Sequence, residues 1–490
     1  MSSVSNTTVP AAPRHPRGLS TLFFTEMWER CSYYGMRALL VLFMTAAVQQ
    51  GGLGFSDKLA GAIYGLYTAA VYLAALPGGW VADRLLGAQK TVWLGGAMIA
   101  LGHFTLAVPR IEAFYLGLLF VALGTGLLKP NISAIVGKLY PEGGARRDAG
   151  FTIFYMGINV GAFIGPLMCG WLGEKVNWHA GFAAAGVGMV VGLAQFSAMR
   201  GRLGDAGRQP DGGAVRARDR GLAWTALAVV VAATALLMLG VVRLNPVALA
   251  QSAKWIILGI ALVFFLHLFL SRTLTGEEKR RVGVIAILFI SSALFFSGFE
   301  QAGSSLNLFA ERYTLRTLGG WEAPASWFQM LNPLFVVTLA PVVAGVWVTL
   351  ARRGRDIPLG VKFALGLLLL AAGFLVIMLG AQRAAHGQVV PVWLLMTYLL
   401  HTVAELCLSP VGLSSVTKLA PPRYVGQMMG IWFLAASLGN LVAGLIAGEC
   451  GSGPADMAHR FLIVALSAIG LGLVLLALAG LMRKWMAGIK

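Results

Sequence analysis

Charged residues are scarce in this sequence. Asp, Glu, Lys and Arg make up 12% of its 490 residues, whereas a soluble globular protein carries about 25%. Hydrophobic residues account for 58%, and the mean hydropathy is +0.76. The apolar residues form continuous runs of about 18 or more instead of alternating with polar ones, which excludes a soluble globular protein and a β-barrel. The sequence predicts an all-α polytopic membrane protein.

Cysteine is rare as well. The four cysteines are scattered, mostly inside apolar runs, and lack Cys-x-x-Cys spacing. The seven histidines show no metal-ligand spacing, and no Ser/His/Asp set stands out. We therefore expect no structural disulfides, no metal site, no cofactor and no enzymatic activity. The polar N-terminal stretch has no short apolar segment, so we expect no cleavable signal peptide.

Acidic residues are the scarcer of the two charges. There are 20 Asp and Glu against 38 Lys and Arg, which gives a net charge of +18. Such an excess can indicate nucleic-acid binding, but here the Lys and Arg lie between apolar runs. An even number of apolar segments places both chain ends on the same side of the membrane. The loops on that side are the ones rich in Lys and Arg. The positive-inside rule therefore predicts cytoplasmic termini and a lipid-embedded chain without a nucleic-acid partner.

An internal repeat divides the apolar segments into two halves. The stretches LKPNISAIVGKLYP and LSPVGLSSVTKLAP, residues 128–141 and 408–421, align without gaps, with Pro130 matching Pro410. This places the fourth segment opposite the twelfth, so two six-helix halves flank two accessory helices. Parallel repeats of this kind build the major facilitator fold. We predict fourteen transmembrane helices at residues 19–48, 58–83, 90–108, 113–138, 149–173, 179–199, 221–242, 252–271, 281–308, 326–350, 358–380, 391–416, 424–448 and 459–484.

The same division gives the expected domains. The N-terminal six-helix bundle spans residues 1–199, and the C-terminal six-helix bundle spans residues 281–490. Residues 200–280 form a basic linker with the two accessory transmembrane helices, whose role the sequence does not explain.

The first apolar segment carries charges inside the membrane. Glu26, Glu29, Arg30, Tyr33 and Arg37 follow a spacing of three or four residues, which keeps them on one helix face. At a rise of 1.5 Å per residue, the stripe extends over about 16 Å from near one end of the helix toward mid-membrane. A charge there costs roughly 2.5–3.5 kcal/mol on insertion scales, so the stripe should face a cavity or a partner.

Further intramembrane charges differ in sign between the halves. The N-terminal half supplies the cations Arg37 and Lys129, and the C-terminal half supplies the carboxylates Glu300 and Glu405. A cavity between the halves would then have a positive and a negative wall, which suits a zwitterion with an amine and a carboxylate. Alternatively, these charges pair permanently and only fix helix packing. Polar neighbours recur beside them: Asn159, Asn332 and Ser409.

A carboxylate next to a cation also offers a route for protons. It stays ionised while the cation is near, and it takes up a proton when the cation leaves and burial disfavours its charge. An ion pair that exists in only one conformation therefore couples protonation to that conformation.

Several motifs resemble the proton-dependent oligopeptide transporter (POT/PTR) family of the major facilitator superfamily. The resemblance covers nearly the whole chain and includes the accessory helices typical of bacterial members. It implies a proton-coupled symporter that imports di- and tripeptides by alternating access, as a monomer in the bacterial cytoplasmic (inner) membrane. The motifs are ExxERxSYYGMR, LKPN, DAGFTIFYMGINVGA, FEQAGSSLNLFAER, FQMLNPLF, ELCLSPVGLSSVTKLAPPR and GIWFLAASLGNLVAG.

The resemblance also implies roles for individual residues. Arg37 and Glu300 match the two partners of the periplasmic gate, and Cys31 stands where the family usually has Phe. The proton is the coupling ion, and the implied proton-coupling residues are Glu26, Glu29, Arg30, Lys129 and Glu300. The implied substrate-binding residues are Tyr33, Tyr34, Arg37, Tyr72, Lys129, Asn159, Asn332, Glu405, Ser409 and Trp432.

Two other functions stay open at this point. A family member that carries nitrate or another anion would fit the fold, but the intact first-helix motif and Glu405 favour a substrate with an amine. A polytopic membrane enzyme or a peptide sensor without transport is the second alternative. Competition between dipeptide and nitrate, and net flux in proteoliposomes, would separate these functions.

Overall fold

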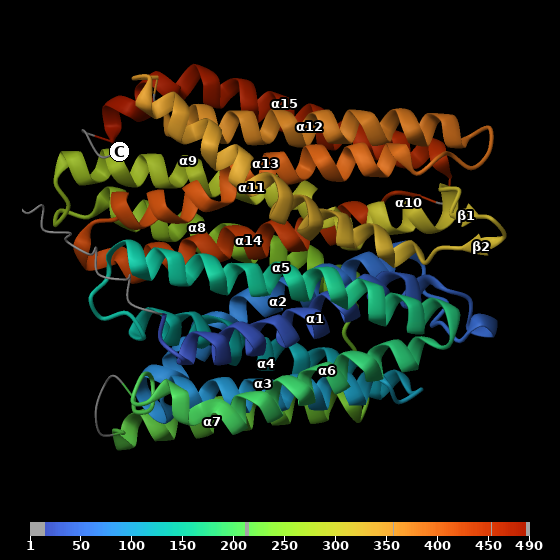
Figure 1. The fold of residues 1–490 in the computed structure, drawn as a ribbon, viewed down its shortest axis with the longest axis horizontal. Coiled ribbons are helices and arrows are strands. Elements are labelled where there is room, and N and C mark those ends of the chain that lie inside the picture. The colour runs from blue at the N-terminus through green and yellow to red at the C-terminus, as the bar shows by residue number, and fades with distance from the viewer. Residues whose placement is uncertain (1–14, 211–214, 356, 452, 487–490) are drawn as a thin grey trace, which may run out of the picture.

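The chain folds into a bundle of long helices that lie almost parallel to one another (Figure 1). The structure, a computed structural model, describes residues 15–210, 215–355, 357–451 and 453–486, apart from the side chains of Leu318, Pro410 and Leu413. Long apolar segments become helices in a membrane because only a helix satisfies its own backbone hydrogen bonds there. Within the described part of the chain, twelve helical segments are long and apolar enough to cross a membrane.

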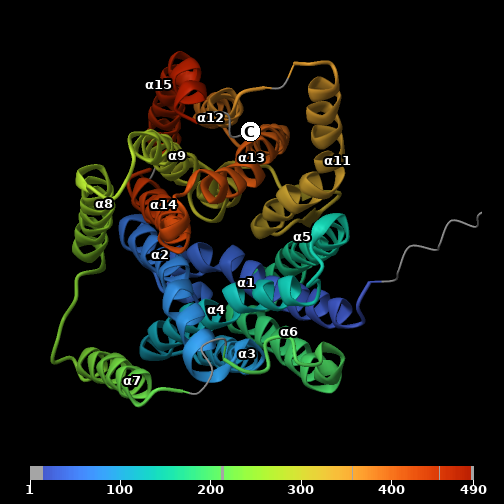
Figure 2. The same ribbon diagram turned by 90° about the vertical axis from the view of Figure 1, so that its left-hand side faces the viewer.

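Six helices form the N-terminal half. They are α1 (Gly18–Thr45), α2 (Asp57–Val81), α3 (Ala88–Leu106), α4 (Ile111–Lys138), α5 (Gly144–Lys175) and α6 (Trp178–Met199). Short turns extend this half: η1 (Val48–Gln50), the π-helical turn η2 (Ala82–Leu86) and η3 (Arg200–Leu203). Helices α1 and α3 are not among the twelve apolar segments, but they have 28 and 19 residues and lie among the others in Figure 2.

The C-terminal half repeats this arrangement with one break. Its long helices are α9 (Gly276–Phe299), α11 (Leu331–Arg352), α12 (Leu359–Ala384), α13 (Val392–Leu419), α14 (Val425–Gly448) and α15 (Pro454–Trp485). The shorter elements are η4 (Glu300–Gly303), α10 (Ser305–Tyr313), the hairpin of β1 (Thr317–Leu318) and β2 (Trp321–Glu322), η5 (Ala325–Met330) and η6 (Pro422–Tyr424). The single helix predicted at 281–308 is thus divided into α9, η4 and α10.

The two accessory helices differ in their contacts. Helix α8 (Pro246–Leu270) packs against α2, α9 and α14, whereas α7 (Ala217–Met238) contacts η2 and every one of its residues is at least partly exposed. Figure 2 shows both outside the main bundle. Helix α9 begins before residue 281, so the predicted boundary falls inside this helix. The division into domains itself stays a prediction.

Close helix packing depends on glycine. A Cβ atom on Gly161 of α5 would lie 2.1 Å from the carbonyl oxygen of Met27 on α1. Between the halves, a Cβ on Gly61 of α2 would lie 2.4 Å from the carbonyl oxygen of Gly444 on α14. Backbones this close exclude any larger residue, as is typical of small residues at helix interfaces in membranes. Cys31 also lies in the α1–α5 interface, 1% exposed.

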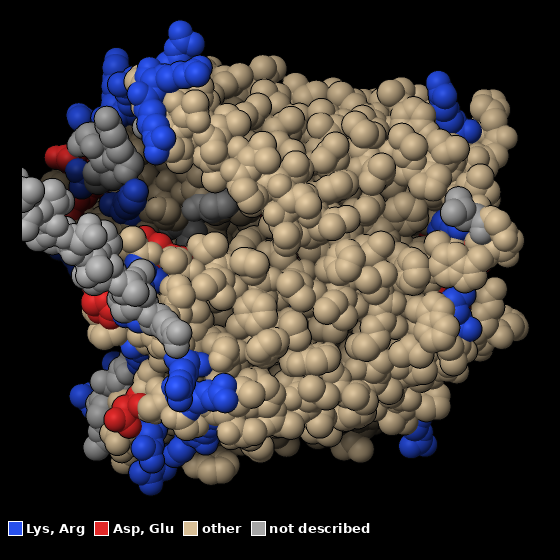
Figure 3. All heavy atoms as spheres, in the orientation of Figure 1, with Lys and Arg blue, Asp and Glu red and all other residues tan. Residues whose placement is uncertain are grey.

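Basic side chains gather at one side of the bundle. We call this the terminus side, because the described chain begins and ends there: His15 bonds to Tyr140 after α4 (2.8 Å), and Trp485 lies against Gly283 near the start of α9. Figure 3 shows most of the visible Lys and Arg at this side and few at the opposite side. This is the distribution that the loop composition predicted, while the orientation in the membrane stays a prediction.

Candidate functional site

The charged stripe of α1 is buried in the N-terminal half. Glu26, Glu29 and Arg30 are 2%, 0% and 3% exposed. Arg30 Nε lies 3.2 Å from Glu26 Oε1 and also contacts the Glu29 carboxylate. Yet Glu26 Oε2, Glu29 Oε1 and Arg30 Nη2 are buried without a hydrogen-bond partner among the described residues. Buried charges are costly unless fully paired, so this incompletely satisfied cluster calls for an explanation, and its coupling role stays a prediction.

Lys129 of α4 does not pair with these acids in this conformation. Its Nζ lies over the ring of Tyr72, 4.7 Å from the ring centre. Within the described residues, no carboxylate lies within ion-pair distance of Lys129. An ammonium above an aromatic ring is favourable but leaves the cation free to change partners. The implied pairing with Glu26 and Glu29 therefore stays a prediction for another conformation.

Arg37 and Glu300 form the predicted pair between the halves. Arg37 Nη2 lies 2.8 Å from Glu300 Oε2, and Arg37 Nε donates to the Tyr64 hydroxyl at 2.8 Å. Glu300 begins the η4 turn that interrupts α9 and α10. A Cβ atom on Gly303 of this turn would lie 2.1 Å from the Tyr64 hydroxyl and 2.9 Å from Arg37 Nε. The bare backbone of Gly303 thus makes room for this buried pair.

Beyond this pair, polar contacts join the halves at the opposite side. Arg312 of α10 donates two hydrogen bonds of 2.7 Å to Asp57 at the start of α2. The Glu174 carboxylate of α5 accepts the backbone N–H groups of Ala325 (2.7 Å) and Ser326 (2.9 Å), the first residues of η5. An acidic side chain at a helix start satisfies its free N–H groups.

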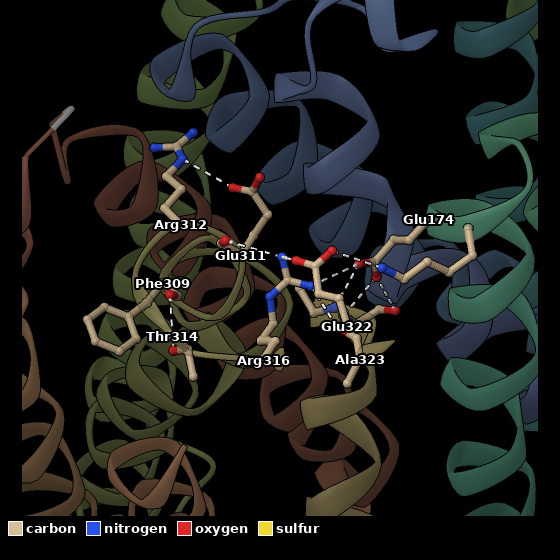
Figure 4. Close-up of polar contacts among 11 residues, drawn as sticks. Glu174, Phe309, Glu311, Arg312, Thr314, Arg316, Glu322 and Ala323 are labelled. Atoms are coloured by element: carbon tan, nitrogen blue, oxygen red, sulfur yellow. Dashed lines mark hydrogen bonds and ion pairs between the residues drawn. The ribbon is translucent and has the colours of Figure 1, made fainter. Parts of the chain in front are cut away.

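The hairpin between α10 and η5 completes this contact. Arg316 lies between Glu174 and Glu322, with a distance of 2.8 Å to Glu322 (Figure 4). Lys175 of α5 lies 3.0 Å from Glu322, and this hydrogen bond holds the pKa of Glu322 below its ordinary value. Figure 3 shows the molecule hollowed at the terminus side. The described conformation is therefore closed on the opposite side and open toward the termini.

A pocket lies between the two halves, next to the Arg37–Glu300 pair. It holds about 730 Å³ of empty space, open solvent included. Six predicted residues line it: Tyr34, Arg37, Asn159, Glu300, Asn332 and Glu405. The remaining lining residues are Tyr155, Ile158, Ala162, Pro166, Phe299, Ala302, Gln329, Pro333, Tyr398 and His401.

The two walls of the pocket carry opposite charges, as the sequence predicted. On the N-terminal side, the Arg37 guanidinium lies 5.6 Å from the ring centre of Tyr34. On the C-terminal side, Asn332 Nδ2 donates to Glu405 Oε2 (3.0 Å) and to Thr402 Oγ1 (3.1 Å). Cationic and anionic groups face the same space, so one ligand with both charges can contact both.

Five predicted binding residues lie outside this lining in the described conformation. Tyr33 stacks beneath Arg30, 5.2 Å from its guanidinium carbon, and Tyr72 contacts Lys129. Trp432 packs against α13, where a Cβ on Gly412 would lie 2.1 Å from its ring. The Ser409 hydroxyl is buried without a partner among the described residues. The assignment of these five residues to substrate binding stays a prediction, as does that of the five that line the pocket.

The sequence also carried a signal for some of the lining residues that we did not predict. Tyr155 precedes Asn159 by four residues on α5, and His401 precedes Glu405 by four on α13. Residues four apart share a helix face, so both could have been read from their predicted neighbours. Across the described residues, no group of three or more His, Cys, Asp or Glu could hold a metal ion.

Comparisons with known proteins identify the family of this chain. The sequence profile of the POT family matches residues 89–463. The peptide transporter YePEPT of Yersinia enterocolitica is 45% identical over 90% of this chain and 89% of its own. A di-/tripeptide transporter of Lactococcus lactis subsp. cremoris is 38% identical over 97% of each chain.

Solved structures of POT transporters are similar to this chain in both fold and sequence. A crystal structure of a peptide transporter POT in complex with sulfate has a TM-score of 0.90 and 41% identity, over 97% of this chain and 96% of that one. A crystal structure of a POT family transporter in complex with 5-aminolevulinic acid has a TM-score of 0.87 and 33% identity, over 96% of this chain and 97% of that one.

Proposed function

The chain belongs to the POT family, a family of multi-pass membrane transporters rather than of enzymes, and we propose that it is a proton-coupled symporter for di- and tripeptides. The observation that carries this proposal is the pocket between the halves, with Arg37 in one wall and Glu405 in the other. A peptide is a zwitterion with an ammonium at one end and a carboxylate at the other. Guanidinium and carboxylate groups are strong partners for these two ends.

The charged walls of the pocket fit the two ends of a peptide rather than its side chains. Backbone and end groups are common to all peptides, whereas side chains differ. A site that recognises the two ends therefore admits many sequences but limits the distance between the ends.

Proton coupling is supported by the α1 cluster. Glu26 and Glu29 share Arg30, and each retains a buried oxygen without a partner among the described residues. Among the described residues, Lys129 has no carboxylate partner. Its approach to Glu26 and Glu29 would favour their ionised form, and its withdrawal would favour their protonation. A membrane potential supplies about 2.3 kcal/mol per proton per 100 mV, which corresponds to roughly 50-fold accumulation of a neutral substrate.

Alternating access requires the contacts of the opposite side to break. In the outward-open conformation, Arg37 and Glu300 separate, and the terminus side closes. We place the protein in the bacterial cytoplasmic membrane as a monomer, with both termini in the cytoplasm. The described conformation is then the inward-open one, from which a peptide is released to the cytoplasm.

Uptake into proteoliposomes with an imposed proton gradient tests the proposal. The purified protein should accumulate labelled Ala-Ala above its external concentration, and di- and tripeptides should compete while nitrate does not. Glu26→Gln, Glu29→Gln and Lys129→Ala should abolish gradient-driven accumulation. Ala228→Ser on the exposed α7 serves as a control and should behave like the unchanged protein.

The outcomes separate the functions. Accumulation of dipeptide by the three variants would refute the assignment of the coupling cluster. Competition by nitrate instead of peptides would point to an anion carrier. Peptide binding without net flux would identify a sensor and refute transport.

A further inference from the structure

His401 lines the pocket but has no part in the functions described above. It precedes Glu405 by four residues on α13, and both side chains belong to the pocket wall. Residues at this spacing lie on the same helix face, one turn apart. The imidazole is 2% exposed, so its environment is set by the protein and by whatever occupies the pocket.

The hydrogen-bond partner of His401 shows which ring nitrogen carries the hydrogen. His401 Nε2 lies 3.2 Å from the backbone carbonyl oxygen of Leu370 on α12. A carbonyl oxygen only accepts hydrogen bonds, so Nε2 must carry the hydrogen. In the neutral imidazole, Nδ1 then has a lone pair and is an acceptor.

The packing of the ring shows where this acceptor points. A Cβ atom on Gly373 of α12 would lie 2.4 Å from His401 Cδ2 and 2.6 Å from Nε2. Nδ1 is across the ring from the bond between these two atoms, so it points away from α12. The Phe374 ring, 4.8 Å away between centres, holds the imidazole in this orientation. Among the described residues, Nδ1 has no hydrogen-bond partner.

The neighbouring Glu405 carboxylate also offers a hydrogen-bond acceptor. Asn332 donates to Glu405 Oε2, and the other oxygen of Glu405 accepts no hydrogen bond from the described residues. An ammonium group has three N–H donors and no acceptor. One carboxylate oxygen satisfies one of these donors, and an imidazole lone pair one turn away can satisfy another.

We propose that His401 Nδ1 is a second acceptor for the α-ammonium of the substrate, beside Glu405, and makes the site select for a free amino terminus. The inference rests on the proposed function, since it concerns the ligand of the same pocket. A purely structural role for His401 would be the tie from α13 to α12 through Nε2.

Two substitutions separate these roles. Asparagine places an amide oxygen near the position of Nδ1, so His401→Asn keeps the acceptor and loses the bond to Leu370. Glutamine places an amide nitrogen near the position of Nε2, so His401→Gln keeps that bond and loses the acceptor. His267→Gln on the exposed face of α8 is a matched control.

The measurement is inhibition of labelled Ala-Ala uptake by Ala-Ala and by N-propionyl-alanine, which has the same shape but no ammonium. His401→Gln should raise the inhibition constant of Ala-Ala about tenfold, which is the effect of losing one hydrogen bond to a charged group. His401→Asn should keep the affinity for Ala-Ala within about threefold. N-propionyl-alanine should inhibit all variants equally.

Other results overturn the inference. An unchanged His401→Gln together with a weakened His401→Asn would assign His401 to the contact with α12. An equal loss for both inhibitors in either variant would show a structural effect without recognition of the ammonium. If the unchanged protein takes up no Ala-Ala, the proposed function fails, and this inference fails with it.

Discussion

Replacing Gly303 by alanine would insert a methyl group between Arg37 and Tyr64 in the closed gate. The added Cβ would lie 2.1 Å from the Tyr64 hydroxyl and 2.9 Å from Arg37 Nε, where ordinary contacts begin at 3.4 Å. The hydroxyl would have to move away by about 1 Å, because the side chain is buried on all sides. This displacement weakens the hydrogen bond from Arg37 and disturbs its pairing with Glu300.

The overpacking destabilises only the conformation in which the gate is closed. Overpacking of this kind costs about 1–3 kcal/mol, and a hydrogen bond to a charged group contributes about 1.5–3 kcal/mol. Part of the hydrogen bond survives after relaxation, so we expect a total of about 1–3 kcal/mol. The cost disappears when the gate opens. The equilibrium should therefore shift roughly 5- to 150-fold toward the outward-open conformation.

Labelling of a single cysteine measures this shift. Gln329→Cys, in the pocket wall, is introduced after the native cysteines are replaced, and an impermeant maleimide is added to the side opposite the termini. Gly303→Ala should label faster. Gly298→Ala is the control, because the atoms nearest to its Cβ belong to Leu370 and Phe374 within the C-terminal half. Equal labelling rates in Gly303→Ala and Gly298→Ala would refute the steric reasoning.

Repeating the measurement in the Tyr64→Phe variant strengthens the test. Tyr64→Phe removes the hydroxyl that the new methyl group would strike. If the contact with Tyr64 causes the shift, Gly303→Ala should add much less in this background, because effects at contacting residues are not additive. A full additional shift would place the cause elsewhere.

Three further predictions concern the contacts of the opposite side. Glu174→Ala removes the carboxylate that caps the start of η5, so the same labelling assay should show a more open gate by about 1 kcal/mol; an unchanged rate would contradict this. Asp57→Arg and Arg312→Asp should each impair uptake, and the combined exchange should restore it, because the two-bond pair is then reversed in sign; an additive loss would exclude the pairing. The depressed pKa of Glu322, caused by Lys175, means that its stabilisation is present above the ordinary carboxyl pKa and is lost as pH falls through the depressed value. Glu322→Gln should thus lower the unfolding temperature at neutral pH but not in strong acid, and an equal effect at both pH values would refute the assignment.

The transmembrane helices were predictable because the membrane imposes a local rule. A long apolar run must become a helix, since no other conformation satisfies its backbone in lipid. The predicted segments therefore agree with the observed helices to within about six residues at each end, α8 differing most. The exception is the segment from Gly276 to Tyr313, where η4 interrupts the helix at Glu300. Its local sequence does not show that Arg37 and Tyr64, far away in the chain, need the space above Gly303.

The site was predictable in part for a similar reason. Spacing on α1 placed Glu26 and Arg30 one turn apart, and the structure shows them paired. The Arg37–Glu300 pair came from the family resemblance, because no spacing rule relates residues on different halves. The Asp57–Arg312 pair was missed, since its partners lie 255 residues apart. The position of Lys129 over Tyr72 was missed because it depends on the conformation that the protein adopts.

The sequence by itself determined the helices, their charged faces and the repeat that relates the halves. These features follow from composition and from the period of a single helix, so they need no knowledge of neighbours. Only the tertiary structure decided which charges pair, which predicted side chains reach the pocket, and which side is closed. Those properties depend on how closely two backbones approach, as at Gly61 and Gly444, and that distance is set jointly by residues far apart in the chain.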